Sequence, residues 1–400
     1  MRLLRSERFA GALLLIAAGL GLAIGASAAG PALAAFLAEP LPIAVPGLGL
    51  SPADWAGQGL LVLFYYVIAI DLRRELRTGE LSTPVRAALP AIAAAGGLLG
   101  PALVYVAIDR GEHPAGWTVP LATDPALALA VLAVFGRWMP ARVRVFLLAL
   151  AVLDDLAALL IVAAMGTDAL SVGWLVAAIA GIAVFGAVSR NLSPWSVWSI
   201  RMRPRAPILV LLWILAIAVW YATLRSGVHP AIAGAALGIV TTRGLARRAR
   251  ATLEPWAFGL ALPIFAFTAA VVPVVALVPH ELGSAFWAIA IAGPVGKFVG
   301  ISLAGILGGL ALRGRSRIRT LPDLFVVAAL AGLGFTVSLF LGEVAFADDP
   351  TLADESALAV IAGSTVSLVI GALAVALRSR HYGRQLRAGI LRRPADTVDR

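Results

Sequence analysis

Four ionisable residues lie deep inside apolar stretches of the sequence: Asp124, Asp154, Asp155 and Lys297. A charged side chain at the centre of a membrane helix costs about 2.5–3.5 kcal/mol on insertion scales. Four uncompensated charges would cost about 10 kcal/mol, comparable to the whole stability of an ordinary domain. These side chains must therefore face a wet cavity, pair with one another, or become neutral by proton exchange. Each solution favours a pathway for ions or protons over a structural scaffold.

The aspartates Asp154 and Asp155 are neighbours in the chain, so on a helix their side chains point about 100° apart. One carboxyl group can then face a water-filled funnel while the other faces a neighbouring helix. The alternative is that the pair lies at a helix end. Apolar residues extend for two turns on both sides, which favours the helix centre.

Lys297 is the only lysine, and the other 31 of the 32 basic residues are arginines. Arginine keeps its proton, whereas a buried lysine can release it. The sequence predicts a partner carboxylate for Lys297, either Asp154 or Asp124. The alternative is a lysine side chain that extends along the lipid to the membrane interface.

Two segments are candidates for interruptions of spanning helices. Pro125 follows Asp124, and proline disfavours helical geometry at the residue before it. The alternative there is an ordinary helix that begins at Pro125 and is capped by Asp124. The second candidate is the glycine-containing segment 331–336. Paired interruptions in the two halves of a chain are typical of an inverted-repeat transporter with its site near the midplane.

The composition indicates a protein whose solvent is largely lipid, because 60% of the 400 residues are hydrophobic and 14% are charged. A spanning helix needs about 20 mostly apolar residues. The sequence therefore predicts an all-α polytopic membrane protein with 12 transmembrane helices, near 9–30, 57–72, 86–108, 119–136, 143–164, 172–189, 207–223, 228–242, 256–277, 285–311, 323–346 and 357–377. We expect residues 1–378 to form a single transmembrane domain and residues 379–400 a basic cytoplasmic tail, with a polar, frayed segment from Arg378 onward.

The arginines test this topology independently, because cytoplasmic loops are rich in Lys and Arg. With a cytoplasmic N-terminus, the outside loops contain only Arg110 and Arg225, and 29 of the 31 arginines fall inside. The sequence thus predicts cytoplasmic termini. The first stretch, residues 1–30, also has a basic start and a small-residue segment, so a cleaved signal peptide is the alternative to a first helix.

Several function classes are excluded. The chain has no cysteine, so it has no disulfide and no thiolate metal site. The basic residues lie in short clusters between apolar runs, which argues against nucleic acid as a partner. No histidine pair has metal-ligand spacing, and no phosphate-binding loop or nucleophilic triad is present. We therefore expect a transporter in the lipid bilayer rather than an enzyme, with no cofactor.

Longer motifs resemble the NhaA family of sodium/proton antiporters. The resemblance runs from about residue 7 to 378 and is carried by five motifs and one charged segment: 122–129, 146–156, 226–230, 296–303, 334–340 and the segment 71–76. It implies an inverted-repeat fold of twelve helices in which the fourth and eleventh are discontinuous and cross near the midplane. It also implies electrogenic export of sodium (or lithium) against two protons, with a role in pH and sodium homeostasis.

Carried over from the family, Asp155 is the main ion-binding carboxylate and Thr123 helps to ligate the ion. Asp154 pairs with Lys297, and Asp124 offsets charge where the half-helices cross. Sodium is a hard cation that prefers oxygen ligands, and Asp155, Asp154 and Thr123 supply such oxygens. The proton gradient drives the exchange, since no nucleotide-binding motif is present. A homodimer is left open.

The region that the family links with pH activation is represented here by Asp71, Glu75 and His229. Asp71 stands where the family has a glutamate, and Arg250 replaces a family glutamate in the region linked with the pH response. Pro125 replaces isoleucine or valine and could shift the break in the fourth helix. Residues 265–270 depart from an asparagine-containing family run.

Two other functions remain as alternatives. Intramembrane aspartyl proteases use two membrane aspartates for acid–base chemistry, but they resemble one another in a Gly-x-Gly-Asp run that is absent here. A sodium-coupled symporter on a related fold is the third interpretation, and sodium-driven uptake of an organic solute without proton release would favour it.

Overall fold

The computed structural model describes residues 7–79, 81–165, 171–191, 206–271, 282–312, 320–346 and 348–388, and these residues form helices and connections without a β-strand. The α-helices are α1 (Glu7–Gly25), α2 (Gly30–Ala38), α3 (Pro52–Asp54), α4 (Leu61–Thr78), α5 (Pro84–Asp109), α6 (Pro125–Phe135), α7 (Ala141–Met165), α8 (Val172–Asn191), α10 (Ala206–Arg225), α11 (Ala231–Val240), α12 (Arg243–Trp256), α13 (Leu262–Ala270), α14 (Ser284–Ile291), α15 (Lys297–Ala311), α16 (Leu321–Ala331), α17 (Thr336–Ala345) and α18 (Pro350–Arg387). Short 3₁₀ or π segments are η2 (Trp55–Leu60), η3 (Pro114–Leu121), η5 (Ala257–Ala261) and η7 (Ala292–Gly296).

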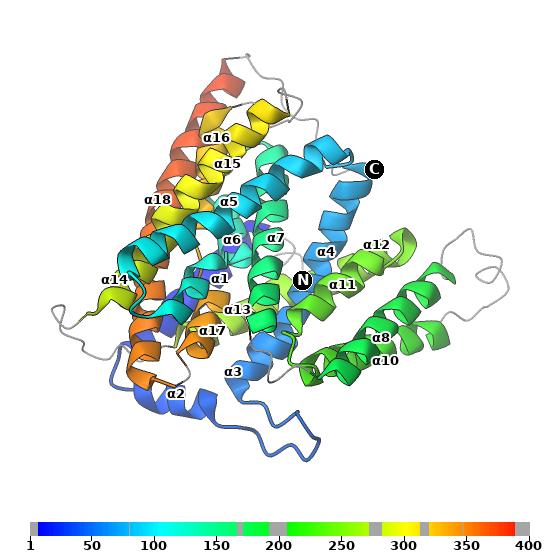
Figure 1. Ribbon diagram of the computed structural model, residues 1–400. Coiled ribbons are helices and arrows are strands. Elements are labelled where there is room, and N and C mark those ends of the chain that lie inside the picture. Colours follow the sequence, from blue (N-terminus) through cyan, green and yellow to red (C-terminus); the bar gives the residue numbers. More distant parts are fainter. Residues whose placement is uncertain are drawn as a thin grey trace.

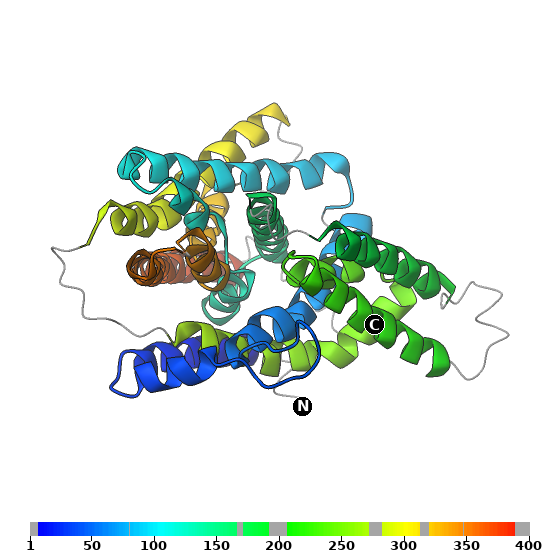
Figure 2. The ribbon, with the colours of Figure 1, turned by 60° about the horizontal axis from the view of Figure 1, so that its bottom comes forward.

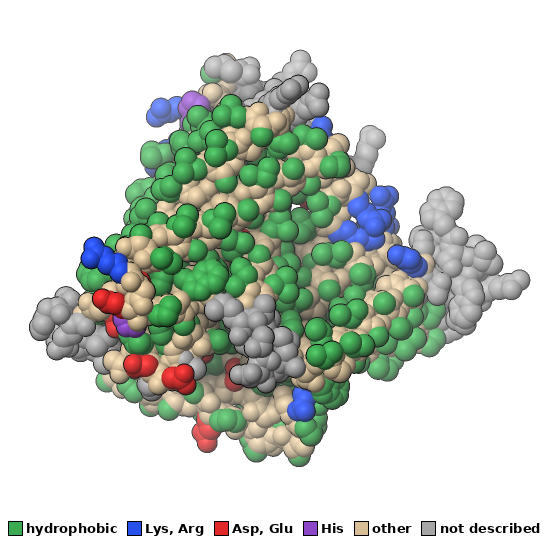
Figure 3. Space-filling model, in the orientation of Figure 1, with side chains coloured by type: hydrophobic (Ala, Val, Ile, Leu, Met, Phe, Trp, Pro, Cys, Tyr) green, Lys and Arg blue, Asp and Glu red, His purple; other side chains and the backbone are tan. Residues whose placement is uncertain are grey.

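The outer surface of this bundle is apolar. Leu103, Val172 and Leu310 are 69%, 70% and 71% exposed, and hydrophobic side chains cover most of the face seen in Figure 3. Most Lys and Arg side chains on that face gather in its upper and right parts, and most Asp and Glu side chains lie toward the lower left. Such a surface is stable when lipid replaces water around it.

Among the described residues, eight helices are long and apolar enough to cross a membrane, or nine if a bent pair counts as one span. The prediction of a polytopic all-α membrane protein is therefore confirmed at this level. The helices Ala231–Val240 and Leu321–Ala331 are apolar but shorter. Residues 272–277 of the ninth expected span, the arginines at 201–205 and 313–319, and residues 389–400 of the tail lie outside the described part.

Both ends of the chain differ from the sequence-based expectation. The first helix ends at Gly25 rather than near residue 30, and a 112° bend leads into α2, which the apolar pattern did not separate. At the other end, α18 continues to Arg387. The expectation of a frayed segment from Arg378 is wrong for residues 378–387, because Arg378 and Tyr382 bind partners on other helices.

Glycine allows the closest helix contacts in the bundle. A Cβ atom on Gly96 of α5 would overlap the backbone of Gly300 in α15, and one on Gly100 would overlap the backbone of Gly296. Small residues at such positions let two membrane helices approach closely. The yellow α15 accordingly lies along the cyan α5, while α8 and α10 form a separate edge of the bundle (Figures 1 and 2).

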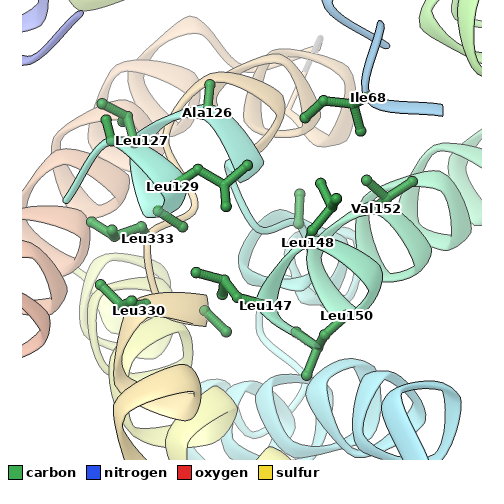
Figure 4. Packing of buried hydrophobic residues seen from close by; sticks show 14 of the residues in the cluster. Ile68, Ala126, Leu127, Leu129, Leu147, Leu148, Leu150, Val152, Leu330 and Leu333 are labelled. Carbon is green, nitrogen blue, oxygen red and sulfur yellow. The ribbon is translucent and has the colours of Figure 1, made fainter. Parts of the chain in front are cut away.

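The two segments expected to interrupt helices meet inside the bundle. The 3₁₀ segment η3 ends at Leu121 and α6 begins at Pro125, while α16 ends at Ala331 and α17 begins at Thr336. Across these gaps the backbone N–H of Asp124 donates to the carbonyl oxygen of Leu333 at 2.5 Å. Figure 4 shows Leu333 beside Leu127 and Leu129 of α6, with Leu147 of α7 facing them.

Candidate functional site

The helix α7 carries the adjacent aspartates Asp154 and Asp155 near its middle. Both residues are 0% exposed. The alternative of a helix end is therefore wrong, since more than two turns of helix lie on each side of the pair. The fold places two carboxyl groups where water does not reach them in this conformation.

Lys297, the first residue of α15 after the π segment η7, binds one of these aspartates. Its Nζ atom forms an ion pair with Oδ2 of Asp154 and donates to the hydroxyl oxygen of Thr123 at 2.6 Å. Lys297 is 0% exposed, so its side chain does not extend to the membrane interface. Of the two partners that the sequence allowed, the structure pairs the lysine with Asp154.

Thr123 connects this ion pair to the two helix gaps. Its Oγ1 atom lies 2.7 Å from Oδ2 of Asp154 and 2.8 Å from the carbonyl oxygen of Ala331, and its single proton can serve one of them at a time. Ala331 is the last residue of α16, where a carbonyl group lacks a partner within the helix. No ligand contact between Thr123 and Asp155 is present among the described atoms; the hydroxyl faces Asp154 instead.

Asp124 caps α6 in the way that the ordinary-helix alternative proposed. Its Oδ1 atom accepts hydrogen bonds from the backbone N–H groups of Ala126 at 3.0 Å and Leu127 at 3.1 Å, and Pro125 occupies the first position of the helix. The gap before α6 exists as well, because Ala122 and Asp124 have extended backbone geometry. The non-helical residues before Pro125 and the cap by Asp124 therefore occur together.

Asp155 is the exception in this network. Neither of its carboxylate oxygens has a hydrogen-bond partner among the described residues, and Oδ1 of Asp154 also lacks one. Buried polar atoms are normally paired, and an unpaired one calls for an explanation. A carboxylate without donors is stable in such a place only when a proton or a cation neutralises it.

Two cavities in the described part of the chain lie beside α6 and beside the two helix gaps. One runs along α6 and is lined by Leu129, Ala130, Asp71, Arg144 and Glu254, among others. The second touches the two gaps and is lined by residues that include Ala122, Gly332, Gly334, Gly293 and Pro294. Asp154, Asp155 and Lys297 are themselves 0% exposed, so this conformation is closed around the carboxyl groups.

The residues expected to act in pH response do not form one cluster. Asp71 of α4 pairs with Arg250 of α12, with Oδ1 2.9 Å from Nε, and Glu75 lies one helical turn further along α4. His229 precedes α11 and packs its ring against Phe340, with centroids 5.4 Å apart.

The direction of the helices separates His229 from the other two. Gly234 of α11 packs on Val62 and Gly238 packs on Tyr66, so α11 and α4 run in the same direction. His229, before the start of α11, therefore lies toward the opposite end of α4 from Asp71.

Some residues at the site were not found from the sequence. The carbonyl groups of Ala331 and Leu333 contact Thr123 and Asp124, but a backbone group leaves no signal of its own in the sequence.

Fold and site together define a class: a multi-pass membrane protein in which Asp124, Asp154, Asp155 and Lys297 are buried where two helix gaps meet. The sequence also matches a family model described as Na+/H+ antiporter 1 over residues 1–375. The chain therefore belongs to the Na+/H+ antiporter 1 family. This confirms the resemblance to the NhaA antiporters that the motifs indicated.

Curated relatives agree with this assignment. The chain is 47% identical over 385 residues to the Na(+)/H(+) antiporter NhaA 2 of Clavibacter michiganensis, covering 96% of this chain and 93% of the relative. It is 37% identical to the Na(+)/H(+) antiporter NhaA of Tropheryma whipplei, covering 96% and 97%. It is 38% identical to the Na(+)/H(+) antiporter NhaA of Nocardia farcinica, covering 96% and 92%. The similarity thus extends over nearly the full length of each protein.

Proposed function

We propose that this protein exchanges sodium ions for protons across a bacterial inner membrane. The observation that carries the proposal is the carboxyl group of Asp155, which is buried without a hydrogen-bond partner among the described residues, next to the Asp154–Lys297 ion pair. A proton and a sodium ion are alternative ways to neutralise such a group. Family membership supports the same activity.

The proposed binding site consists of oxygen atoms from Asp155, Asp154 and Thr123. In the closed conformation Lys297 occupies Asp154, so sodium can use that carboxylate only after the lysine has moved away or lost its proton. The site then holds either a sodium ion or the exchanged protons, but not both. Competition combined with alternating access gives exchange that the proton gradient can drive.

We further propose the finer features of the family for this chain: electrogenic exchange of two protons for each sodium ion, transport of lithium, and a role in pH and sodium homeostasis. The Asp154–Lys297 ion pair supports the exchange of more than one proton for each sodium ion. In this proposal both Asp155 and the ion pair change charge when sodium binds. Asp71, Glu75 and His229 are proposed to contribute to the pH response. Asp71 pairs with Arg250, which stands where the family has a glutamate. This pairing supports a pH response that differs from that of relatives with the glutamate.

The proposed architecture has 12 transmembrane helices in two inverted repeats, with discontinuous fourth and eleventh helices that cross near the midplane. The hydrogen bond between Asp124 and Leu333, one from each gap, supports the crossing. The one-sided distribution of arginines supports cytoplasmic termini and a basic cytoplasmic tail after residue 378. We propose a single transmembrane domain over residues 1–378, and a homodimer as the assembly.

The test is sodium-induced proton movement in everted membrane vesicles that contain the protein. We expect Asp155→Asn to abolish this movement, because the amide cannot bind a proton or replace the anionic ligand. The matched control is Asp354→Asn, the same chemical change at an exposed position on α18. Retained sodium-dependent proton movement in Asp155→Asn vesicles would remove this carboxyl group from the mechanism.

A further inference from the structure

A further buried carboxylate lies at the opposite end of α16 from the ion site. Asp323 stands in the first turn of α16 and is 0% exposed. It contacts neither Thr123 nor the Asp154–Lys297 pair, and the exchange proposed above does not use it. Burying a carboxylate is costly unless it is paired and hydrogen-bonded, so its surroundings indicate what it does.

Donors from two other helices surround Asp323. From α18, Arg378 donates its Nε–H to Oδ1 at 2.7 Å, and the Tyr382 hydroxyl lies 2.7 Å from Oδ2. From the first turn of α7, Arg142 approaches Oδ2 at 3.4 Å and the Tyr382 hydroxyl at 3.0 Å. Both oxygens of the carboxylate are therefore held from different directions, which fixes the carboxylate in position and orientation.

The same part of α18 also holds the connection between α6 and α7. The Ser379 hydroxyl accepts a hydrogen bond from the backbone N–H of Trp138 at 3.0 Å. The guanidinium group of Arg378 stacks over the Tyr382 ring with 4.6 Å to the centroid, which orders both side chains. The end of α18 thus ties together three segments: the start of α16, the start of α7 and the connection between α6 and α7.

The helix α16 links this attachment to the ion site. It has 11 residues, so at 1.5 Å per residue it is about 16 Å long and behaves as a short rigid rod. Asp323 lies at one end. At the other end the carbonyl oxygen of Ala331 contacts Thr123, and Leu333 in the following gap contacts Asp124. A tilt or a shift of the rod at its attached end would move these two contacts.

We propose that Asp323, Arg378, Tyr382 and Arg142 form a positioning network that sets the place of α16, and through it the geometry of Thr123 and Asp124 at the ion site. The proposal rests on the exchange function proposed above. Asp323 is a positioning residue, since it touches neither transported ion. Its loss should weaken sodium binding more than it slows turnover, because the ligand geometry changes while the carboxyl groups that exchange ions remain.

The test compares sodium-dependent proton movement between variants in proteoliposomes that contain equal amounts of folded protein. Folding is checked before reconstitution, by a monodisperse peak on size-exclusion chromatography. We expect Asp323→Asn to raise the KM for sodium by about three- to thirtyfold, the range typical of residues that couple to a distant site. The maximal rate should change less than KM. Tyr382→Phe keeps the ring under Arg378 and removes one hydroxyl, so it should raise KM in the same direction and by less.

The control is Arg380→Gln, which removes a positive charge from an exposed position of the same helix and should leave KM unchanged. The double variant Asp323→Asn/Tyr382→Phe should raise KM by less than the product of the single effects, because both residues act through one network.

Folded Asp323→Asn protein with the KM of the wild type would overturn the positioning role. If Asp323→Asn does not fold, an unchanged KM in Tyr382→Phe overturns it equally. Wild-type protein without sodium-dependent proton movement would instead refute the exchange function, and the two failures are thereby distinguished.

Discussion

Replacing Lys297 by alanine should destabilise the protein substantially, because it leaves Asp154 without its ion-pair partner. Lys297 and Asp154 are both 0% exposed, and the lysine also donates to Thr123 at 2.6 Å. Removing one partner of a buried pair costs roughly 3–5 kcal/mol, since the remaining charge stays buried without compensation. We therefore expect Lys297→Ala to lower the free energy of unfolding by about that amount.

The measurement is equilibrium unfolding in detergent, followed by circular dichroism. The double variant Lys297→Ala/Asp154→Ala should be less destabilised than the sum of the two single variants, because it contains no orphaned charge. Leu303→Ala, which shortens a side chain that is 56% exposed on the same helix, is the control and should change stability little. An unfolding midpoint of Lys297→Ala equal to that of the wild type, or strict additivity in the double variant, would refute the buried ion pair.

Two smaller effects can be measured in the same way. Asp124→Ala removes the side-chain oxygen that caps α6 and should cost about 0.5–2 kcal/mol of stability, whereas no loss would contradict the capping geometry. Arg250→Gln breaks the ion pair with Asp71, in which the arginine side chain is 29% exposed and the aspartate side chain 21% exposed. It should lower the free energy of unfolding by no more than about 1 kcal/mol, because water screens such a pair. A loss as large as that of Lys297→Ala would contradict an Asp71–Arg250 pair that is screened by water.

The sequence was sufficient to predict the buried charges, because a charge within an apolar run has few stable environments. The run around Asp154 and Asp155 predicted a helix centre, and the single lysine among arginines predicted an ion pair. The sequence left open whether Lys297 binds Asp154 or Asp124, because that choice depends on how α5, α7 and α15 cross. Gly96 and Gly300 allow that crossing, but glycine is too common in membrane helices to reveal it in advance.

Other features depend on contacts between distant parts of the chain. The end of α18 was expected to fray because its composition is polar, and the partners of Arg378 and Tyr382 lie more than 50 residues away. Tertiary contacts, and not local preference, decided the end of α18. The bend between α1 and α2 instead coincides with local features, because the Ser27 hydroxyl donates to the carbonyl oxygen of Ile24 and a proline stands in the first turn of α2.

The central claim is that the buried carboxyl group of Asp155 binds either a proton or sodium, and proton release from purified protein tests it most directly. Sodium chloride is added to detergent-solubilised protein in a weakly buffered solution that contains a pH indicator, with choline chloride as the control salt. Wild-type protein should release protons on addition of sodium but not of choline, and Asp155→Asn protein should release markedly fewer. Equal proton release from both proteins, or none from the wild type, would contradict competition at this carboxyl group.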